Sequence, residues 1–170
     1  MFSQQTLKVP RDQVQLRVLD TDDLNLLSDM ERIERLCHRN PWDERSCREC
    51  FSDSYKICAV FLSEKLVGYA VIYSAMVTTD LLTIGVEPKY QGKGLGALLL
   101  EYTLQQAFEQ KANECFLEVR VSNLKAQNLY RKFGFVQVGV RRGYYAASSG
   151  AEAEDAYTMV NSNLGAIFNI

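Results

Sequence analysis

The chain has 170 residues, which is long enough for one domain with a substantial hydrophobic core. It is 47% apolar and 24% charged, and its formal net charge is −2. This mild acidity argues against a nucleic-acid-binding surface, which requires a basic face. No stretch approaches the roughly 20 apolar residues of a membrane span, and the N-terminus lacks the basic-then-apolar order of a signal peptide. We therefore expect a cytoplasmic protein that binds neither nucleic acid nor membrane.

The cysteines indicate free thiols and not a metal site. Their number is odd, at five, and without an export signal this favours a reducing compartment. Cys47 and Cys50 form a single C-x-x-C pair, and His38 is the one histidine of the sequence. A structural zinc site needs about four such ligands. The preferred interpretation is one helical turn that carries two small residues, and no metal is expected.

The first half of the chain contains patterns for a strand, two helices and a hairpin. Apolar and polar residues alternate over residues 14–18, as in a strand. Residues 21–37 begin with capping residues and continue with apolar residues at helical spacing. A break at 40–42 is followed by a short helix to about residue 51. Residues 55–62 and 66–77 are rich in β-formers and are separated by a turn of hairpin length.

Residues 81–97 combine a strand, a turn and a glycine loop. The strand pattern ends at residue 86, and Pro88 cannot continue a ladder. Three glycines follow at every second position, and an apolar helix is expected from about 95 to 110. Glycines let a backbone approach a ligand, and a helix N-terminus presents unpaired N–H groups and a positive dipole end. The stretch predicts a seat for a phosphate.

The second half predicts a strand at 115–121, a helix that begins at the Ser122-Asn123 cap and ends at Gly134, and strands near 139–146 and 155–160. The order β-α-α-β-β-β-α-β-α-β-β predicts an α/β fold with a mixed, mostly antiparallel sheet flanked by helices. We expect a single domain over residues 1–160. Residues 161–170 carry no pattern and are expected to form a loose C-terminal tail.

Three interpretations of the glycine loop arise from the residues alone. A Walker loop is rejected because Lys93 is followed by glycine and not by serine or threonine. A dinucleotide loop fits Gly92-x-Gly94-x-x-Ala97, but five residues separate the strand from the first glycine, where that motif has a tight turn. A ligand-free corner leaves the glycines without a reason, since each costs about 0.5–1 kcal/mol in a helix.

The stretch from Val86 to Gly96, V-x-P-x-Y-Q-G-K-G-L-G, resembles the acetyl-CoA-binding motif of the GNAT acetyltransferases, which has Q/R-x-x-G-x-G/A at its centre. The resemblance implies the GNAT fold and acetyl-CoA as acetyl donor. It also implies that the loop amides hold the CoA pyrophosphate and that the preceding strand pairs with the pantetheine arm. The cofactor-binding residues implied in this way are Ile84, Gly85, Val86, Gly92, Lys93, Gly94, Leu95, Gly96 and Ala97.

Further motifs resemble the RimI-type ribosomal-protein-alanine N-acetyltransferases over roughly residues 33–159. These motifs are L-E-V-R-x-S-N at 117–123, Y-Y at 144–145, E-D-A at 154–156 and N-P-W at 40–42. The group usually has G-R-E-D-A, whereas residues 150–156 are longer by two and lack the arginine. The resemblance implies direct acetylation of an N-terminal alanine, with small-subunit ribosomal protein eighteen as substrate. The alternatives are a lysine or small-molecule amine as acceptor, and a CoA-binding module without catalysis.

The resemblance assigns two catalytic residues, and each has an alternative role. Glu118 is the general base, or else a surface partner of Arg120 on the same strand face. Tyr130 is the general acid, since a phenol with a pKa near 10 can protonate a thiolate whose thiol has a pKa of about 8.5. Its alternative is a place in an ordinary core stripe. An N-terminal amine, with a pKa of about 7.7–8.0, needs only modest help to lose its proton.

Other residues complete the predicted site. Asn123 is a helix N-cap, and the resemblance adds a contact with pantetheine or substrate. The backbone N–H of Val86 is the candidate oxyanion donor. Tyr144 and Tyr145 are expected on opposite strand faces, one in the core and the other walling the peptide site. The acidic residues Glu152, Glu154 and Asp155 are hypothesised to attract a basic ribosomal-protein tail, or else form a solvated loop. No pattern predicts an oligomeric state.

Overall fold

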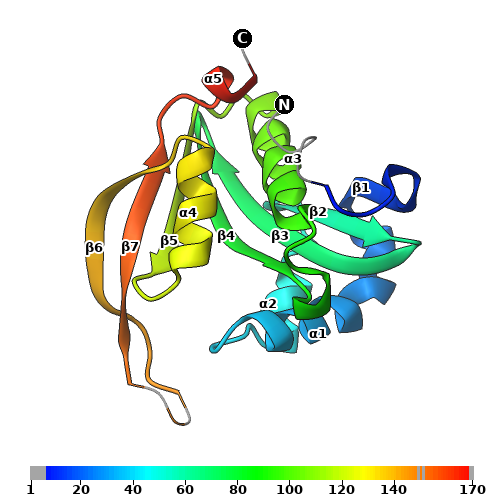
Figure 1. The fold of residues 1–170 in the computed structure, drawn as a ribbon, viewed down its shortest axis with the longest axis horizontal. Helices are drawn as coiled ribbons and strands as arrows, with labels where there is room; N and C mark the ends of the chain where they lie inside the picture. The colour runs from blue at the N-terminus through cyan, green and yellow to red at the C-terminus, as the bar shows by residue number, and fades with distance from the viewer. Residues whose placement is uncertain (1–6, 149, 151, 169–170) are drawn as a thin grey trace.

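The computed structural model describes residues 7–148, 150 and 152–168. Seven strands form one sheet in the order β1-β2-β3-β4-β5-β7-β6 (Figure 1). The β4–β5 pair is parallel and every other pair of neighbours is antiparallel. The predicted α/β class with a mixed, mostly antiparallel sheet is confirmed. The strands are β1 (Val14–Leu19), β2 (Tyr55–Leu62), β3 (Lys65–Ala75), β4 (Thr78–Val86), β5 (Glu114–Arg120), β6 (Val136–Tyr145) and β7 (Glu154–Asn161).

Helices cover both faces of this sheet (Figure 1). One hydrophobic cluster lies under α3 (Leu95–Glu109) and α4 (Leu124–Lys132), and a second lies under α1 (Leu27–Cys37) and α2 (Glu44–Glu49). Alternate residues of β2 belong to the two clusters, so this strand is buried on both faces. That burial explains its continuous apolar run. The short elements are η2 (Arg11–Gln13), η3 (Thr21–Leu26), η4 (Pro88–Tyr90) and α5 (Gly165–Phe168).

The expected helix at 21–37 is divided in two. Its first six residues form the 3₁₀ helix η3, and α1 begins at Leu27. The N-cap is Asp20, whose side chain and that of Asp23 form a reciprocal capping box. Arg17 of β1 also donates two hydrogen bonds of 2.7 Å to Asp23. These contacts stabilise the tighter 3₁₀ geometry of residues 21–26 ahead of the α-helix.

The C-terminal segment is packed, which corrects the expectation of a loose tail. β7 extends to Asn161, whose side-chain amide donates to the carbonyl of Phe133 at 2.7 Å. Leu164 is fully buried, and its N–H donates to the carbonyl of Asn113 at 2.9 Å. Ile167 of α5 is also part of the cluster beneath α3. The anchor contacts come from residues 28 to 51 positions earlier in the chain, which no local pattern could reveal. The last two residues lie outside the described part.

The strands β4 and β5 diverge at a bulge in β4. In the β3–β4 register Thr83 faces Val71 and Leu81 faces Ile72, so Leu82 is the extra residue. The parallel β4–β5 pairing stops at Leu81, although β4 continues to Val86. A bulge bends its strand, and this one turns the end of β4 away from β5. Figure 1 shows the two strands together at one end and apart at the other. This opening positions the candidate site.

Candidate active site

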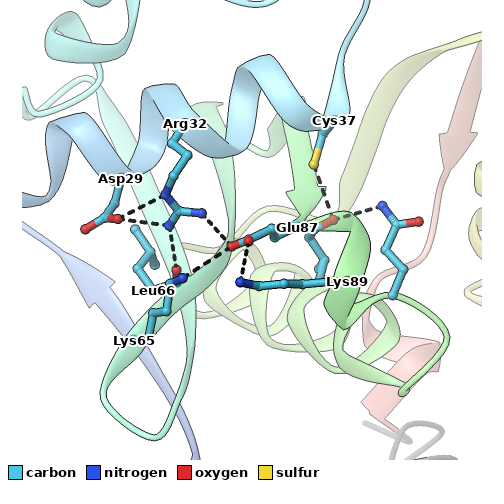
Figure 2. A network of polar contacts seen from close by, with 9 residues as sticks. Asp29, Arg32, Cys37, Lys65, Leu66, Glu87 and Lys89 are labelled. Carbon is cyan, nitrogen blue, oxygen red and sulfur yellow. Dashed lines mark hydrogen bonds and ion pairs between the residues drawn. The ribbon is translucent and has the colours of Figure 1, made fainter.

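The end of β4 presents backbone groups to the opening. The N–H of Glu87 donates to the carbonyl of Val67 on β3 at 2.8 Å. Because successive residues of a strand turn their N–H and C=O groups to alternate sides, those of Val86 and Ile84 face away from β3. The carbonyl of Val86 accepts hydrogen bonds from Gln91 Nε2 at 2.9 Å and from Cys37 Sγ at 3.3 Å (Figure 2). The N–H of Val86 therefore faces away from β3, and its role as oxyanion donor stays a prediction.

The glycine loop connects β4 to α3. Gly92 and Gly94 have φ values of +74° and +87°, which favour glycine, and Gly94 is the N-cap of α3 without a side-chain capping bond. The first helical amides have no intrahelical acceptor. A Cβ on Gly92 would meet nothing within 4 Å, and one on Gly96 would touch only Val86 Cγ2, at 4.0 Å. Packing within the described residues therefore does not require glycine at 96, whereas a phosphate that lies against the loop would.

A cluster of charges anchors the start of the loop (Figure 2). Glu87 is 6% exposed and is ion-paired with Arg32 of α1, with Lys89 at 3.1 Å and with Lys65 at 3.9 Å. Burial alone would raise the pKa of Glu87, but the hydrogen bonds from Arg32 and Lys89 and the nearby positive charges hold this pKa below its usual value. The ionised carboxylate of Glu87 thus ties the end of β4 to α1 through Arg32.

A second buried carboxylate connects α1 to β3 and β4. Glu34 of α1 is 2% exposed and accepts hydrogen bonds from Tyr69 Oη at 2.6 Å and from Thr83 Oγ1 at 2.9 Å. It also accepts from the backbone N–H of Trp42 at 3.2 Å. His38 Nε2 lies 3.2 Å from Thr83 Oγ1, so the histidine belongs to this structural network. Burial raises the pKa of Tyr69 well above its usual value, and the adjacent Glu34 adds to this effect.

Glu118 lies on β5 beside the opening. Its neighbours Leu117 and Val119 are buried under the α3–α4 face, so the carboxylate points to the opposite face and is half-buried. Arg141 Nη1 of β6 donates to Glu118 Oε1 at 3.0 Å. The alternative role as partner of Arg120 is wrong, because Arg120 is paired with Glu154. The carboxylate therefore lies at the surface of the opening and is ion-paired with Arg141.

Tyr130 occupies α4 on the other face of β5. It is 6% exposed, and its ring centroid lies 5.9 Å from that of Phe135. Burial raises the pKa of Tyr130 above its usual value, and Tyr145 and Cys115 add to the effect. Among the described residues its hydroxyl has no hydrogen-bond partner, yet no fully buried side-chain polar atom there lacks one. The hydroxyl is therefore not completely buried.

Asn123 is the N-cap of α4, as predicted. Its Oδ1 accepts from the N–H of Ala126 at 3.1 Å, and its own N–H donates to the carbonyl of Arg120 at 3.0 Å. These bonds hold the start of α4 at the end of β5. Contact between Asn123 and a ligand stays a prediction.

The two tyrosines of β6 lie together, which corrects the expectation of opposite faces. Their rings meet edge to face, with centroids 5.0 Å apart. The β6–β7 register is irregular between Arg141 and Tyr145, and Gly143 has a φ of +60°, so strict alternation is lost. Tyr144 is 42% exposed under the guanidinium of Arg141, and Tyr145 donates to the backbone carbonyl of Glu118 at 3.4 Å. Both rings therefore border the candidate base.

Two of the three acidic residues, Glu154 and Asp155, form hydrogen bonds within the protein. Glu154 binds Arg120 at 2.9 Å and accepts from the N–H of Ser122, also at 2.9 Å. Asp155 Oδ1 accepts from the N–H of Gly143 at 2.8 Å, and Glu152 is exposed. The hypothesis of a purely solvated loop is wrong for Glu154 and Asp155, and attraction of a basic peptide now depends mainly on Glu152.

A pocket of mixed polar and apolar lining adjoins the bulge on the face that carries Glu118. Its volume is about 200 Å³, and its lining residues are Trp42, Ser46, Glu49, Cys50, Tyr55 and Leu82. Cys50 and Cys47 of α2 are both buried thiols, in line with the predicted single helical turn. Within the described ranges, His, Cys, Asp and Glu side chains form no group of three that could hold a metal ion. No described helix has the length and apolar character that a membrane crossing requires.

Comparison with known proteins gives the same family from sequence and from structure. A family model described as "Acetyltransferase (GNAT) family" matches residues 27–135. The chain is 32% identical over 120 residues to the ribosomal protein bS18-alanine N-acetyltransferase of Escherichia coli K12, which covers 71% of this chain and 81% of that relative. It is 45% identical over 98 residues to the N-alpha-acetyltransferase RimI of Mycobacterium tuberculosis, covering 55% and 58% of the two chains.

Solved structures have the same fold. The crystal structure of the ribosomal-protein-S18-alanine N-acetyltransferase from Escherichia coli matches with a TM-score of 0.78 and 31% identity, covering 86% of this chain and 92% of that one. A spermidine N-acetyltransferase from Vibrio cholerae in complex with CoA and spermine matches with a TM-score of 0.72 and 20% identity, covering 90% and 97%. The second match is a likeness of fold alone.

Proposed function

Because the chain belongs to the GNAT acetyltransferase family, we propose that it transfers the acetyl group of acetyl-CoA to the α-amine of a protein N-terminus, the alanine of ribosomal protein bS18. Enzymes of this family use acetyl-CoA as co-substrate. The observation that carries the proposal is the opening between β4 and β5, which has the backbone N–H of Val86 on one side and Glu118 on the other. The curated relatives support the choice of acceptor.

The donor half of the site is the end of β4 with the glycine loop. Ile84, Gly85 and Val86 form the part of β4 beyond its pairing with β5, and the backbone groups of Ile84 and the N–H of Val86, which face away from β3, are offered to the amides of the pantetheine arm. The amides of residues 92–97 and the dipole of α3 offer a seat for the pyrophosphate, with Lys93 beside it. The absence of a Cβ at Gly92 and Gly96 leaves room for that group. Acetyl-CoA supplies the reactive thioester; the protein residues hold it in place.

The acid–base residues are divided between the two faces of β5. Glu118 accepts a proton from the acceptor amine, directly or through water, while the amine nitrogen forms a bond to the acetyl carbon. The N–H of Val86 donates to the carbonyl oxygen as it gains negative charge. When the carbon–sulfur bond breaks, Tyr130 gives its proton to the leaving thiolate. Because burial keeps the pKa of Tyr130 above its usual value, this proton is present throughout the neutral range.

The acceptor half lies on the face of Glu118, between the α1–α2 loop (residues 38–43) and the β6–β7 hairpin (residues 136–161). Tyr144, Tyr145 and the pocket beside Leu82 would form its walls. A ribosomal-protein substrate supports the proposal that the enzyme works in the cytoplasm, and the mildly negative net charge supports the proposal that it binds no nucleic acid. A lysine or small-molecule acceptor is the alternative, since acceptor choice resides in these loops. The presence of Glu118, Asn123 and Tyr130 argues against a module without catalysis.

Thiol release from acetyl-CoA tests the proposal. A peptide with the N-terminal sequence of bS18 should support release, and the same peptide with a blocked α-amine should not. A matched peptide whose lysines are methylated but whose α-amine is free controls for side-chain acceptors. Equal rates with free and blocked peptides would exclude the α-amine assignment, and no release with any amine would favour the CoA-binding module.

A further inference from the structure

Arg120 joins three segments that are far apart in the sequence. It ends β5, and its side chain is 16% exposed. Its Nη1 donates to Glu154 Oε2 at 2.9 Å, and its Nη2 donates to Asn40 Oδ1 at 2.6 Å. The guanidinium also lies 3.9 Å from the ring centroid of Tyr145. One side chain thus contacts the α1–α2 loop through Asn40 and the β6–β7 hairpin through Glu154 and Tyr145.

Neighbouring contacts strengthen this junction. Asn40 Nδ2 donates to the carbonyl of Ala146 at 3.4 Å, which links the loop to the hairpin directly. Glu154 also accepts from the N–H of Ser122 at 2.9 Å and lies 3.8 Å from Arg39 Nη1. Burial would raise the pKa of Glu154, but the hydrogen bonds from Ser122 and Arg120 hold this pKa below its usual value. The ion pair with Arg120 therefore persists at neutral pH.

We propose that Arg120 is a positioning residue that sets the acceptor entrance by latching the α1–α2 loop to the β6–β7 hairpin beside Glu118. We call Arg120, Asn40, Glu154 and Tyr145 the acceptor latch. The inference rests on the proposed function, because the acceptor enters between these two segments. A planar guanidinium can bind two acceptors in different directions and stack on a ring at once, whereas an ammonium group cannot.

The latch should affect acceptor binding and leave the chemical step unchanged. Two segments that are already held together lose less conformational entropy when the acceptor binds. A variant in which they are loosened should therefore have a higher KM for the acceptor. Glu118 keeps its ion pair with Arg141, its strand pairing with Thr158 and the hydrogen bond from the latch residue Tyr145 to its carbonyl, none of which is made by the side chain of Arg120. The donor half, at residues 84–86 and 92–97, shares no residue with the latch, so the KM of acetyl-CoA should not change.

Arg120→Lys tests the latch with two independent measurements. It should raise the KM of the bS18 peptide about tenfold, since it removes one hydrogen bond of a charged group and the ring contact. Both kcat and the KM of acetyl-CoA should stay within about twofold of the wild type. Trp42 is the one tryptophan of the sequence and follows Asn40 by two positions. Its quenching by acrylamide should therefore increase in the variant.

Two further variants complete the experiment. Asn40→Ala removes only the loop side of the latch and should change the KM and the quenching in the same direction. Arg17→Lys is the matched control, because Arg17 also makes two hydrogen bonds, to Asp23, and lies 4.9 Å from the ring centroid of Phe61, but on β1. It should change neither measurement.

The outcomes separate a local latch from a general loss of stability. An unchanged acceptor KM and unchanged quenching in Arg120→Lys would overturn the latch. A parallel rise of both KM values with a lower Tm would also overturn it, because this indicates general destabilisation. If the wild-type protein acetylates no α-amine, the proposed function fails, and the quenching of Trp42 then decides the latch by itself.

Discussion

At the scale of single residues, the candidate site depends on how one strand presents its two faces. Leu117 and Val119 bury one face of β5, so Glu118 between them must point to the other, where the acceptor half lies. Tyr130 approaches from the buried face through α4. This separation gives the base and the acid different surroundings, since Glu118 is half-exposed beside Arg141 while burial raises the pKa of Tyr130.

Glu118→Gln should lower kcat/KM about 10²- to 10⁴-fold near pH 7, because the amide cannot accept the amine proton. The deficit should narrow above about pH 8, where an N-terminal amine with a pKa of about 7.7–8.0 is largely neutral without help. Rates at pH 6.5–9.5 would show this. Glu64→Gln, which changes an exposed carboxylate in the turn between β2 and β3, is the matched control. A wild-type rate at pH 7 in Glu118→Gln would contradict the role as base.

Tyr130→Phe should lower kcat by about 10²-fold or more and leave the fold intact. The ring still packs on Phe135, and the lost hydroxyl has no partner within the described residues. Steady-state kinetics and the Tm measure the two effects. Tyr102→Phe on α3 removes a half-buried phenol elsewhere and should change neither. A normal kcat in Tyr130→Phe would assign this tyrosine to the core stripe alone.

At the scale of elements, a bulge and a loop create the site. The extra residue Leu82 ends the β4–β5 ladder and thereby exposes the edge of β4. The loop after β4 is fixed at its start by Glu87 and its ion pairs, and Gln91 bonds back to the carbonyl of Val86. Lys125 of α4 donates to Gln91 Oε1 at 2.8 Å, which links the loop to the helix that carries Tyr130. Gln91 thus connects the end of β4, through Val86, to the helix that carries the candidate general acid Tyr130.

Gly96→Ala should leave the free energy of unfolding unchanged or raise it by up to about 1 kcal/mol, because alanine favours the helix and no described atom clashes with the Cβ. It should nevertheless raise the KM of acetyl-CoA about tenfold, if the open space holds a phosphate. Urea unfolding and initial rates measure the two quantities.

Gly94→Ala is the matched comparison for Gly96→Ala. Its φ of +87° disfavours any side chain, so this variant should lose both acetyl-CoA binding and about 1–2 kcal/mol of stability. An unchanged KM in Gly96→Ala would remove the argument that this glycine serves a ligand.

At the scale of the whole molecule, the sheet separates two hydrophobic clusters, and the buried cysteines are shared between them. Cys58 and Cys115 belong to the cluster under α3, whereas Cys47 of α2 and the C-cap residue Cys50 belong to the cluster of α1 and α2. Burial is the main cause that raises the pKa of Cys47 and Cys58 to about 11 and that of Cys50 and Cys115 to about 12. All four thiols are therefore held neutral by the fold.

Stability should fall at alkaline pH because of these thiols. An unfolded thiol has a pKa of about 8.5, and the folded pKa values are higher, so their contribution is complete below about pH 8.5 and is lost as the pH rises toward 11–12. Each thiol adds a slope of up to about 1.4 kcal/mol per pH unit. Urea unfolding at pH 7–10 under reducing conditions should show this decline, and Cys58→Ala should reduce its slope. A constant unfolding free energy from pH 8 to 10 would contradict it.

The sequence alone determined the features that depend on local pattern. Hydrophobic periodicity predicted the order of strands and helices, Asn123 was recognised as a cap, and the alternation around Glu118 predicted its exposed face. The glycine loop predicted an anion seat because spacing and backbone freedom are properties of adjacent residues. The resemblance of this loop and of residues 117–123 predicted the family, which the comparisons confirmed.

Only the tertiary structure decided which distant residues meet. The partner of Glu118 is Arg141, 23 positions away, and not Arg120, two positions away, whose own partner Asn40 is 80 positions away. The bulge at Leu82 follows from the register with β3, and the packing of α5 follows from contacts with Asn113 and the α3 cluster. Such contacts depend on how the whole chain closes upon itself, and no local sequence pattern encodes them.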